Sequence, residues 1–574
     1  MPGQLVVSVG QSSEKGRKAR NQDFHGAYVP KPPQLGSKGV AIALADGISS
    51  SDVSHVASET AVRSFLEDYF CTSDAWSVKQ SAQRVLMATN SWLYAQTRRS
   101  QYRYDKDRGY VCTLSALVIK STTAHVFHVG DARVYRLQGG ALEQLTEDHR
   151  LWVSREESYL RNALGVDDQV EIDYLPLPVE EGDVFVLATD GVYEHVSARF
   201  MAGAVRNPQS DMDESARAIV AEAYEQGSPD NLTVQIVRVE RLPEHDVDEL
   251  HERLTELPFP PALEPGTVLD GYEILRELHV SSRSYVYLAR NQETGMEVAL
   301  KSPASDLAND PVLLDRFLTE EWIARRVRSP HVVKPFSPNR RRSHLYTVTE
   351  FVDGKTLTQW MADNPRPDIE RVRGIVEQIA KGLRALHRQE IVHQDVRSHN
   401  VLIDAAGTVK IIDLGSARVA GIEERASALE ERHLLGTAQY TAPEYFLGER
   451  GTPQSDIFSL GVIAYQMLTG RLPYGAQVAK TRTRAAQNRL KYDLAHRHNR
   501  DCPAWVDGAL RNAVHPDRNR RYEEVSEFVY DLRHPRKAFL DETRPPLIER
   551  SPERFWQGVS LVLAIAVVVL LFLV

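Results

Sequence analysis

The hydrophobic pattern changes once along this chain of 574 residues, and the change constrains the fold more than any other feature. Residues 1–240 alternate short apolar strand runs with helical blocks, which is typical of an α+β sandwich. Residues 268–534 begin with strand runs and continue with long helical patterns, which predicts a small β-rich lobe followed by a larger helical lobe. The acidic, proline-rich residues 241–267 predict a linker between two domains.

The last residues of the chain form a nearly unbroken apolar run over 555–574. As a helix, this run is long enough to cross a bilayer. Arg550 and Arg554 precede it, so the pattern predicts a single-pass tail anchor with the preceding domains in the cytoplasm, at a bacterial inner membrane. Residues 535–554 would be the juxtamembrane linker. A buried C-terminal core helix is the alternative interpretation.

Charge and cysteine content narrow the set of partners. Asp and Glu outnumber Lys and Arg by 78 to 69, and the net charge of −9 argues against non-specific nucleic-acid binding. The acidic excess lies in the first domain, where it would suit metal cations. Cys71, Cys112 and Cys502 are far apart in the sequence, so they predict neither a disulfide framework nor a zinc ribbon.

Aspartates recur in the first domain at turns beside apolar strand runs. They are Asp23, Asp46, Asp131, Asp190 and Asp230. Each one alone could be an ordinary turn residue. Together, carboxylates at the ends of packed strands would converge on one edge and repel each other unless cations lay between them. Oxygen ligands select Mg²⁺ or Mn²⁺ over zinc, and two such ions can activate water for attack on phosphorus.

These aspartates belong to an ordered series of motifs. GRKARNQD, LADGISSSDVSHVAS, GYVCTLSALVI, HVGDARVYRL, VLATDGVYEHV and GSPDNLTVQIV together resemble the metal-dependent Ser/Thr protein phosphatases of type 2C over about residues 5–240. The resemblance implies a set of ligands for two or three Mg²⁺ or Mn²⁺ ions: Asp46 bridging two ions, the Gly47 carbonyl on one of them, Asp190 and Asp230 on the other, Asp23 through water, and Asp131 on a third, weaker ion.

One substrate-binding position departs from the phosphatase family. The family places an arginine for the substrate phosphate five residues before the first aspartate, and Lys18 stands there. A lysine acts as a point charge without the bidentate fork of arginine, so the phosphate would be held less tightly. His149 and His195 are interpreted as packing or capping residues, because the metal mechanism does not need them.

The second domain contains its own ordered series of motifs. MEVALK ends at Lys301, and Glu320 follows in DRFLTEEWIARRV. HQDVRSHNVLI, VKIIDLGSA, GTAQYTAPE and SDIFSLGVIAYQMLTG come next. In this order and spacing they resemble the eukaryotic-like Ser/Thr protein kinases over residues 268–534, which implies ATP and Mg²⁺ as the nucleotide substrate and its metal ion.

The resemblance to kinases also implies roles for single residues. Lys301 would hold the α- and β-phosphates and pair with Glu320, and Asp395 would accept the proton of the substrate hydroxyl. The remaining expectations are Asn400 and Asp413 on Mg²⁺, Arg397 near the γ-phosphate, Thr437 supporting Asp395, Ser281, Ser284, Val286 and Ala299 at the nucleotide, and Glu444 paired with Arg521.

Three departures from the kinase pattern leave two interpretations open. His279, Ser281 and Ser284 stand where the phosphate-covering loop has glycines. Gln394 replaces the arginine before the catalytic aspartate, and DLG replaces DFG. The domain is either an active kinase, because its ion pair, base and Mg²⁺ ligands are present, or a pseudokinase that binds nucleotide or presents substrates to the phosphatase. A third interpretation is a membrane adaptor in which both enzymes are inactive.

The whole sequence therefore predicts an α+β fold in three parts. An N-terminal α/β/β/α phosphatase-like sandwich is followed by a bilobal protein-kinase-like domain and by one C-terminal transmembrane helix. The expected function is a bifunctional, membrane-tethered protein Ser/Thr phosphatase and kinase of bacterial type. Its expected partners are phosphorylated and unphosphorylated protein substrates, including the chain itself, and the membrane, but no nucleic acid.

Overall fold

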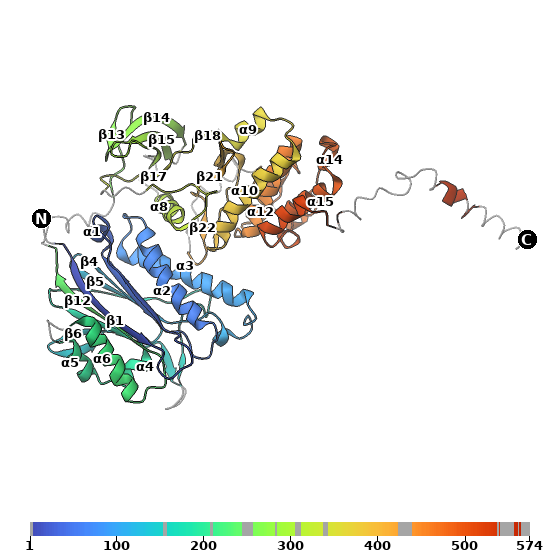
Figure 1. Ribbon diagram of the computed structural model, residues 1–574. Helices are drawn as coiled ribbons and strands as arrows, with labels where there is room; N and C mark the ends of the chain where they lie inside the picture. Colours follow the sequence, from blue (N-terminus) through green and yellow to red (C-terminus); the bar gives the residue numbers. More distant parts are fainter. Residues whose placement is uncertain are drawn as a thin grey trace, which may run out of the picture.

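The computed structural model describes residues 4–152, 158–206, 211–243, 257–281, 284–304, 311–336, 342–422, 439–536, 539, 556–560 and 562–563 (Figure 1). The first part of the chain contains β1 (Val6–Glu14), β2 (Phe24–Tyr28), α1 (Gln34–Lys38), β3 (Val40–Ala45), α2 (Ser54–Cys71), α3 (Val78–Arg99), η1 (Lys106–Arg108), β4 (Leu114–Lys120), β5 (Thr123–Val129), β6 (Arg133–Gln138), β7 (Ala141–Gln144), β8 (Arg150–Trp152), β9 (Ser158–Leu160), β10 (Asp173–Pro178), β11 (Val184–Ala188), α4 (Asp190–Tyr193), α5 (Ala198–Val205), α6 (Met212–Glu225) and β12 (Leu232–Arg241).

Two five-stranded antiparallel sheets form the centre of this first domain. Their strand orders are β1-β12-β11-β6-β7 and β10-β5-β4-β3-β2. All side chains of strand β3 are buried, so both faces of its sheet must be covered by other elements. Alternate side chains of a strand point to opposite faces. Ala41 and Ala43 pack towards helices α2 and α3, whereas Ile42 and Leu44 pack between the two sheets.

Helices cover both outer faces of the sandwich. Helices α2 and α3 pack on the sheet that contains β3, and α5 and α6 pack on the sheet that contains β12. Small residues on the outer face of β3 let α2 approach closely, and Gly10 of β1 does the same for α6, since a Cβ there would lie 2.1 Å from a backbone atom of Met212. The phosphatase-like sandwich expected from the sequence is confirmed.

The second part of the chain forms two lobes. Its elements are β13 (Val268–Leu269), β14 (Tyr272–Val280), β15 (Ser284–Asn291), β16 (Glu297–Pro303), α8 (Pro311–Arg326), β17 (Thr347–Glu350), β18 (Gly354–Thr356), α9 (Leu357–Asp363), α10 (Ile369–His387), β19 (Ile391–Val392), η3 (Ser398–Asn400), β20 (Val401–Asp404), β21 (Val409–Ile411), β22 (Arg418–Val419), η4 (Pro443–Leu447), α12 (Pro453–Thr469), η5 (Val478–Lys480), α13 (Arg484–Gln487), α14 (Ala495–His498), α15 (Ala504–Ala513), η6 (Arg518–Arg520) and α16 (Val525–Arg533).

The small lobe is an antiparallel sheet, and the large lobe is a helical core. The sheet has the order β13-β14-β15-β16-β17, and α8 lies beside it (Figure 1). Helix α10 anchors the large lobe because Val372, Ile375, Val376, Ile379 and Leu383 recur every three or four residues and are buried. The bilobal, kinase-like architecture is confirmed.

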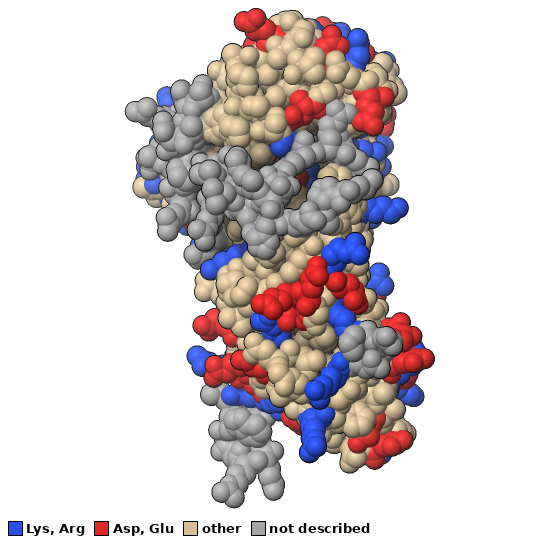
Figure 2. Space-filling model, turned by 90° about the vertical axis from the view of Figure 1, so that its left-hand side faces the viewer, with Lys and Arg blue, Asp and Glu red and all other residues tan. Residues whose placement is uncertain are grey.

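The two domains touch along α2, α3 and α8. One buried apolar cluster runs from the phosphatase-like helices through Trp76 and Trp322 into the large lobe. Figure 1 shows α3 lying between the sandwich and the second domain. On the face drawn in Figure 2, Lys and Arg side chains lie among Asp and Glu side chains.

The predicted membrane anchor over 555–574 is wrong as a description of this structure. Within the parts of the chain that are described, no helix is both long enough and apolar enough to cross a membrane. Helical residues near the C-terminus are described only at 556–560 and 562–563, whereas about 20 continuous helical residues are needed to span a bilayer. Residues 564–574 and most of 535–554 lie outside the described residues.

Candidate active sites

The five aspartates of the first domain lie at strand ends of both sheets. Asp46 follows β3 and Asp23 precedes β2 in one sheet, whereas Asp190 follows β11 and Asp230 precedes β12 in the other. Asp131 lies in the turn from β5 to β6, which joins the two sheets. Because each carboxylate lies within two residues of a strand end, the stacking of the sheets brings all five together, close enough for Asp46 to interact with the other four.

Gly47 allows the chain to turn tightly beside Asp46. A Cβ at this position would lie 2.8 Å from the Gln22 carbonyl oxygen and 2.9 Å from Ser54, so no side chain fits. The Gly47 N–H donates to that same carbonyl at 3.2 Å. The close approach holds the segment before Asp23 against the segment after Asp46, and it places these two carboxylates side by side.

Burial and mutual repulsion dominate the electrostatics of these carboxylates. Burial raises the pKa of Asp46, and the neighbouring Asp23, Asp190, Asp131 and Asp230 raise it further. Burial also raises the pKa of Asp23 to about 6, although the Thr189 hydroxyl donates to Asp23 Oδ2 at 3.0 Å. Asp23 Oδ1 is buried without a hydrogen-bond partner. A buried, unpaired carboxylate oxygen among other carboxylates calls for a cation.

Arg150 supplies part of the positive charge and was not anticipated from the sequence. Its Nε lies 2.5 Å from Asp131 Oδ2, its Nη2 2.8 Å from Asp190 Oδ2 and its Nη1 2.9 Å from Glu194 Oε1. Burial, Asp131 and Asp230 raise the pKa of Asp190 to about 7, and Arg150 opposes that rise. The arginine begins β8, directly after the TEDH sequence. Hydrophobic periodicity predicts helices and strands, so it could not predict that Arg150 lies among the aspartates.

Lys18 also lies at the carboxylate cluster. Its Nζ is 2.5 Å from Asp230 Oδ1 and hydrogen-bonds to Ser49 Oγ. The neighbouring Arg17 points elsewhere and donates to the Gly227 carbonyl at 2.9 Å. His149 accepts a hydrogen bond from the Gly130 N–H at 3.1 Å, in agreement with the structural role expected for it.

The donor set fits hard divalent cations. Only oxygen ligands converge here, which suits Mg²⁺ or Mn²⁺. Among the described residues, no group of three or more His, Cys, Asp or Glu side chains could hold one ion by itself. Mg²⁺ is usually held by one or two carboxylates and completes its shell with water, so pairs such as Asp190 and Asp230 suffice in number.

The second domain builds its charged site around Lys301 on β16. Lys301 Nζ lies 2.8 and 2.7 Å from the two carboxylate oxygens of Glu320 on α8, and 3.3 Å from Asp413 Oδ1. The ion pair expected between Lys301 and Glu320 is therefore present. Burial works against the charged form of Asp413, but Lys301 and the Gly415 N–H hold the pKa of Asp413 below its ordinary value.

The loop that carries Asp395 lies between β19 and η3. Asn400 Nδ2 donates to Asp395 Oδ2 at 3.0 Å, and Arg397 Nε lies 3.2 Å from the same oxygen. Burial raises the pKa of Asp395, and Arg397 lowers it. Asp395, Asn400 and Arg397 are thus brought together as the sequence predicts.

Asp456 orients this loop and was also missed in the sequence. Its carboxylate accepts the backbone N–H groups of His393 and Gln394, both at 2.9 Å, from the first turn of α12. Gln394 has a φ of +65°, which is costly for a residue with a side chain. The two hydrogen bonds to a fully buried carboxylate stabilise that backbone, so Asp456 fixes where Asp395 lies. The available signal in the sequence was an aspartate in the first turn of a predicted apolar helix.

Two serines close the hairpin between β14 and β15. The Ser281 N–H donates to the Ser284 carbonyl at 3.0 Å, and the Ser284 N–H donates to Ser281 Oγ at 3.1 Å. Val286 pairs with Lys301 across the sheet, and Ala299 lies two residues before Lys301. Val286 and Ala299 therefore lie on the same face of the sheet as Lys301. Thr437 lies outside the described residues.

Glu444 and Arg521 pair in the large lobe as expected. Two guanidinium nitrogens of Arg521 each lie 2.7 Å from a carboxylate oxygen of Glu444, and both side chains are buried. This bidentate pair ties η4 to the segment before α16.

Comparisons with known proteins agree with this geometry. A family model described as the protein kinase domain matches residues 272–530, and one described as protein phosphatase 2C matches residues 10–231. Serine/threonine-protein kinase PrkC of Bacillus subtilis is 30% identical over 264 residues, which cover 46% of this chain and 40% of PrkC. PknB of Mycobacterium leprae is 30% identical over 276 residues, which cover 47% and 43%. The matched part is therefore about two fifths of the length of these relatives.

Solved structures match each domain separately. The Mycobacterium tuberculosis serine/threonine phosphatase PstP/Ppp is 24% identical and covers 41% of this chain and 100% of its own, with a TM-score of 0.36. The PknI kinase domain of the same organism is 24% identical and covers 47% and 98%, with a TM-score of 0.36. From the family matches, this chain consists of a protein phosphatase 2C domain followed by a Ser/Thr protein kinase domain.

Proposed function

We propose that this chain is a bifunctional signalling enzyme. Its first domain hydrolyses phosphoserine and phosphothreonine in proteins, and its second domain transfers the γ-phosphoryl group of ATP to protein Ser and Thr hydroxyls. The observation that carries the proposal is the pair of buried charged clusters, one of five aspartates and one around Lys301, each within the residues that one domain family matches.

In the phosphatase domain, Asp46, the Gly47 carbonyl, Asp190 and Asp230 would hold Mg²⁺ or Mn²⁺. When bound, these ions would polarise the phosphoryl group and lower the pKa of a water that serves as nucleophile. Asp23 would order water through its unpaired buried oxygen. Asp131 would hold a weaker third ion.

Lys18 would bind the substrate phosphate in the same domain. It is only about one quarter exposed, and it lies between Asp230 and Ser49, at the open side of the carboxylate cluster. As a compact cation with rotatable donors, it would leave Asp230 for an incoming phosphate when a metal ion takes over that carboxylate.

In the kinase domain, Lys301 would bind the α- and β-phosphates of ATP while Glu320 holds its ammonium group in place. Asp413 and Asn400 would hold Mg²⁺. Asp395 Oδ2 would accept the proton of the protein hydroxyl, with Asn400 and Arg397 fixing its orientation. Because such transfer depends chiefly on positioning and charge neutralisation, these groups suffice for catalysis.

A pseudokinase is the second candidate, and the β14–β15 hairpin favours it. The Ser281 and Ser284 backbone N–H groups are engaged within the hairpin and are not free to cover phosphates. In this alternative, the second domain binds nucleotide or presents substrates to the phosphatase without transferring phosphate.

Labelling with γ-³²P-ATP separates the two candidates. Wild type, Asp395→Asn and Asp190→Ala are incubated with Mg²⁺-ATP in parallel. An active kinase labels wild type and Asp190→Ala but not Asp395→Asn, whereas a pseudokinase labels none of them. If the phosphatase domain limits autophosphorylation, Asp190→Ala retains more label than wild type. Release of phosphate from an aryl phosphate with Mn²⁺ tests the phosphatase domain, and Asp395→Asn is the matched control.

A further inference from the structure

Helix α8 carries Glu320 towards Lys301, and another face of the same helix lies against the phosphatase domain. Asp315, Thr319, Trp322 and Arg326 are spaced by four, three and four residues, which places them on one face of a helix. We call these four residues the α8 docking face. Each contacts α2, α3 or the segment between these two phosphatase helices.

Arg84 of α3 holds the N-terminal half of the α8 docking face. Its Nη2 lies 2.5 Å from Asp315 Oδ2, and its Nη1 donates to Thr319 Oγ1 at 3.1 Å. Gln80, one turn earlier on α3, donates to Asp315 Oδ1 at 3.3 Å. The Arg84 guanidinium also stacks 4.4 Å above the ring of Trp76. The Arg84 guanidinium is therefore held by Trp76 on one side and by Asp315 and Thr319 on the other, so its orientation relative to α8 is fixed.

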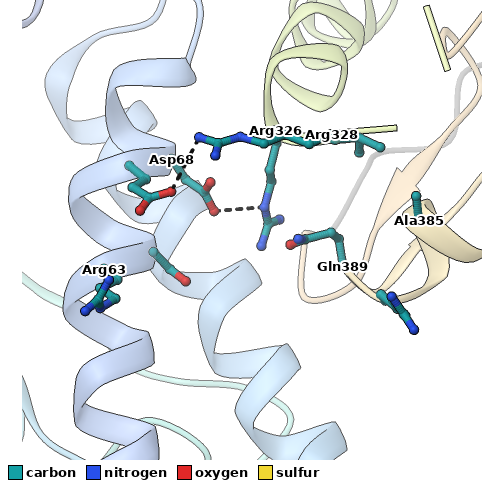
Figure 3. A pocket seen from close by; sticks show the side chains of 10 residues that line it. Arg63, Asp68, Arg326, Arg328, Ala385 and Gln389 are labelled. Atoms are coloured by element: carbon teal, nitrogen blue, oxygen red, sulfur yellow. Dashed lines mark ion pairs between the residues drawn. The ribbon is translucent and has the colours of Figure 1, made fainter. Parts of the chain in front are cut away.

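The C-terminal half of the docking face is more deeply buried. The rings of Trp76 and Trp322 lie 5.9 Å apart, edge to face, and both side chains are buried. Arg326 Nε lies 2.8 Å from Asp68 Oδ2 of α2, with side chains only 4% and 13% exposed (Figure 3). Such a buried pair fixes the end of α8 relative to the end of α2.

The residue next to Glu320 is also tied to the phosphatase domain. Burial of Glu321 works against its charged form, but Arg325, Arg342 and Ser73 lower its pKa to about 2. Ser73 belongs to the segment between α2 and α3. Rotation of α8 about its axis would therefore move Glu320 away from Lys301 and also break the Glu321 contacts.

Helix α3 reaches the large lobe as well. Trp92 Nε1 donates to the Arg388 carbonyl at 3.1 Å, and Arg99 pairs with Glu390 at 2.7 Å. Gly421, after β22, lies so close to α3 that a Cβ there would be 2.1 Å from Ser91 Oγ. One phosphatase helix therefore contacts both lobes of the kinase domain.

We propose that the phosphatase helices α2 and α3 position the kinase nucleotide site by holding α8 in the orientation in which Glu320 pairs with Lys301. Arg84, Trp76 and Asp68 are positioning residues for that pair. The inference rests on the proposed kinase function, because the positioned ion pair binds nucleotide phosphates. It also gives the phosphatase domain a role in the kinase reaction that does not depend on dephosphorylation.

The test measures the Kd of the full chain for a fluorescent ADP analogue in the presence of Mg²⁺. Arg84→Glu places two carboxylates against each other, and we expect a Kd about tenfold higher, within the range measured for coupled charged residues. Adding Asp315→Arg to Arg84→Glu restores the opposite charges and returns the Kd to within about threefold of wild type. Arg98→Glu makes the same charge change at an exposed position of α3 and is the matched control.

A double-mutant cycle with Glu320→Gln shows whether Arg84 acts through Glu320. We expect Arg84→Glu to raise the Kd less than twofold when Glu320 is already Gln. If Arg84→Glu raised the Kd by the same factor in wild type and in Glu320→Gln, the inference would be overturned. An unchanged Kd in Arg84→Glu would overturn it as well, and so would a wild-type chain that binds no nucleotide. Aryl-phosphate hydrolysis with Mn²⁺ checks that the phosphatase domain of each variant is folded. Absence of phosphotransfer in wild type contradicts the proposed kinase function alone, because the Kd does not require transfer.

Discussion

Asp413 of the kinase domain lies in an electrostatic setting opposite to that of the clustered aspartates of the phosphatase domain. In the phosphatase domain, burial raises the pKa of Asp23 to about 6 and that of Asp190 to about 7, and other carboxylates add to the effect. In the kinase domain, Lys301 and a backbone N–H hold the pKa of Asp413 below its ordinary value despite similar burial. In the kinase site one ammonium, that of Lys301, contacts both Glu320 and Asp413. In the phosphatase site Arg150 and Lys18 contact three of the five clustered aspartates, so the carboxylate excess is larger there.

This difference indicates what each site requires from solution. A cluster of buried carboxylates is stabilised by any cation that reaches it, so metal binding and folding should be linked in the phosphatase domain. In the kinase site, the ion pairs of Lys301 with Glu320 and Asp413 are formed without a metal, and the proposed function would add a phosphate ligand that arrives with Mg²⁺.

Asp395→Asn should have the largest effect and should act on one domain only. If Asp395 is the general base, as proposed, its loss lowers phosphotransfer by about 10²–10⁴-fold. Hydrolysis of an aryl phosphate with Mn²⁺ should equal that of wild type, because Asp395 belongs to the other domain. Both rates are measured on the same preparation. Loss of both activities together would show that the two sites are not separable as described.

The stability of the metal-free chain should depend on pH through the phosphatase site. Asp23 and Asp190 bind protons more tightly in the folded chain than in the unfolded chain, where an aspartate has a pKa of about 4. The folded chain therefore holds more protons between about pH 4 and pH 7, and the free energy of unfolding falls as the pH rises through this window.

Asp190→Asn removes part of that pH dependence. We expect the variant to raise Tm relative to wild type by several degrees more at pH 8 than at pH 5.5, in EDTA. Asp413→Asn is the control: the pKa of Asp413 is held below its ordinary value, so Asp413 stays charged across this range and its variant should shift Tm equally at both pH values. The same Tm difference at both pH values for Asp190→Asn would contradict the prediction.

Much of the fold follows from local patterns in the sequence. The apolar run of β3 and the positions of Asp46, Asp190 and Asp230 near strand ends were readable because buried strands are apolar runs that end at polar turns. The pairing of Lys301 with Glu320 was expected from the resemblance of the ordered motifs to protein kinases. The anchor predicted over 555–574 was wrong, because no helix among the described residues is long and apolar enough to cross a membrane.

The missed residues share one physical property. Arg150, Asp456 and Arg84 each act across a tertiary contact with a partner at least 40 residues away in the sequence, as Arg150 does with Asp190, Asp456 with Gln394 and Arg84 with Asp315. Local periodicity carries no information on such partners. The α8 docking face was partly readable, since its spacing of four, three and four is a helical stripe, but nothing in the sequence states what covers it.

Arg150→Ala should tighten metal binding. Its guanidinium bridges Asp131 and Asp190 and so competes with a divalent ion for the same oxygens. Removing this positive charge should lower the Kd for Mn²⁺ by about tenfold, since charges a few Å apart near a protein surface interact by several kcal/mol before water rearranges. Calorimetric titration of the EDTA-treated chain gives both the Kd and the number of ions bound.

Arg133→Ala is the matched control for that titration. Arg133 pairs with Asp148 at 2.7 Å, outside the five-aspartate cluster, so its removal changes the charge of the chain equally. Its Kd for Mn²⁺ should stay within about twofold of wild type. Weaker Mn²⁺ binding in Arg150→Ala would mean that the arginine holds the carboxylates in place for the metal and does not compete with it.

Lys18→Arg should have the smallest effect. A guanidinium offers a phosphate two parallel N–H donors, whereas the Lys18 ammonium is a point charge that also contacts Asp230 and Ser49. We expect KM for a phosphopeptide to fall about two- to fivefold with little change in kcat, because the added hydrogen bond forms in the bound substrate as well as in the transition state. Arg17→Lys, at a residue that donates to the Gly227 carbonyl, is the control and should leave KM unchanged. A higher KM in Lys18→Arg would indicate that the larger side chain cannot leave Asp230, and that this position selects for a cation small enough to move between carboxylate and substrate.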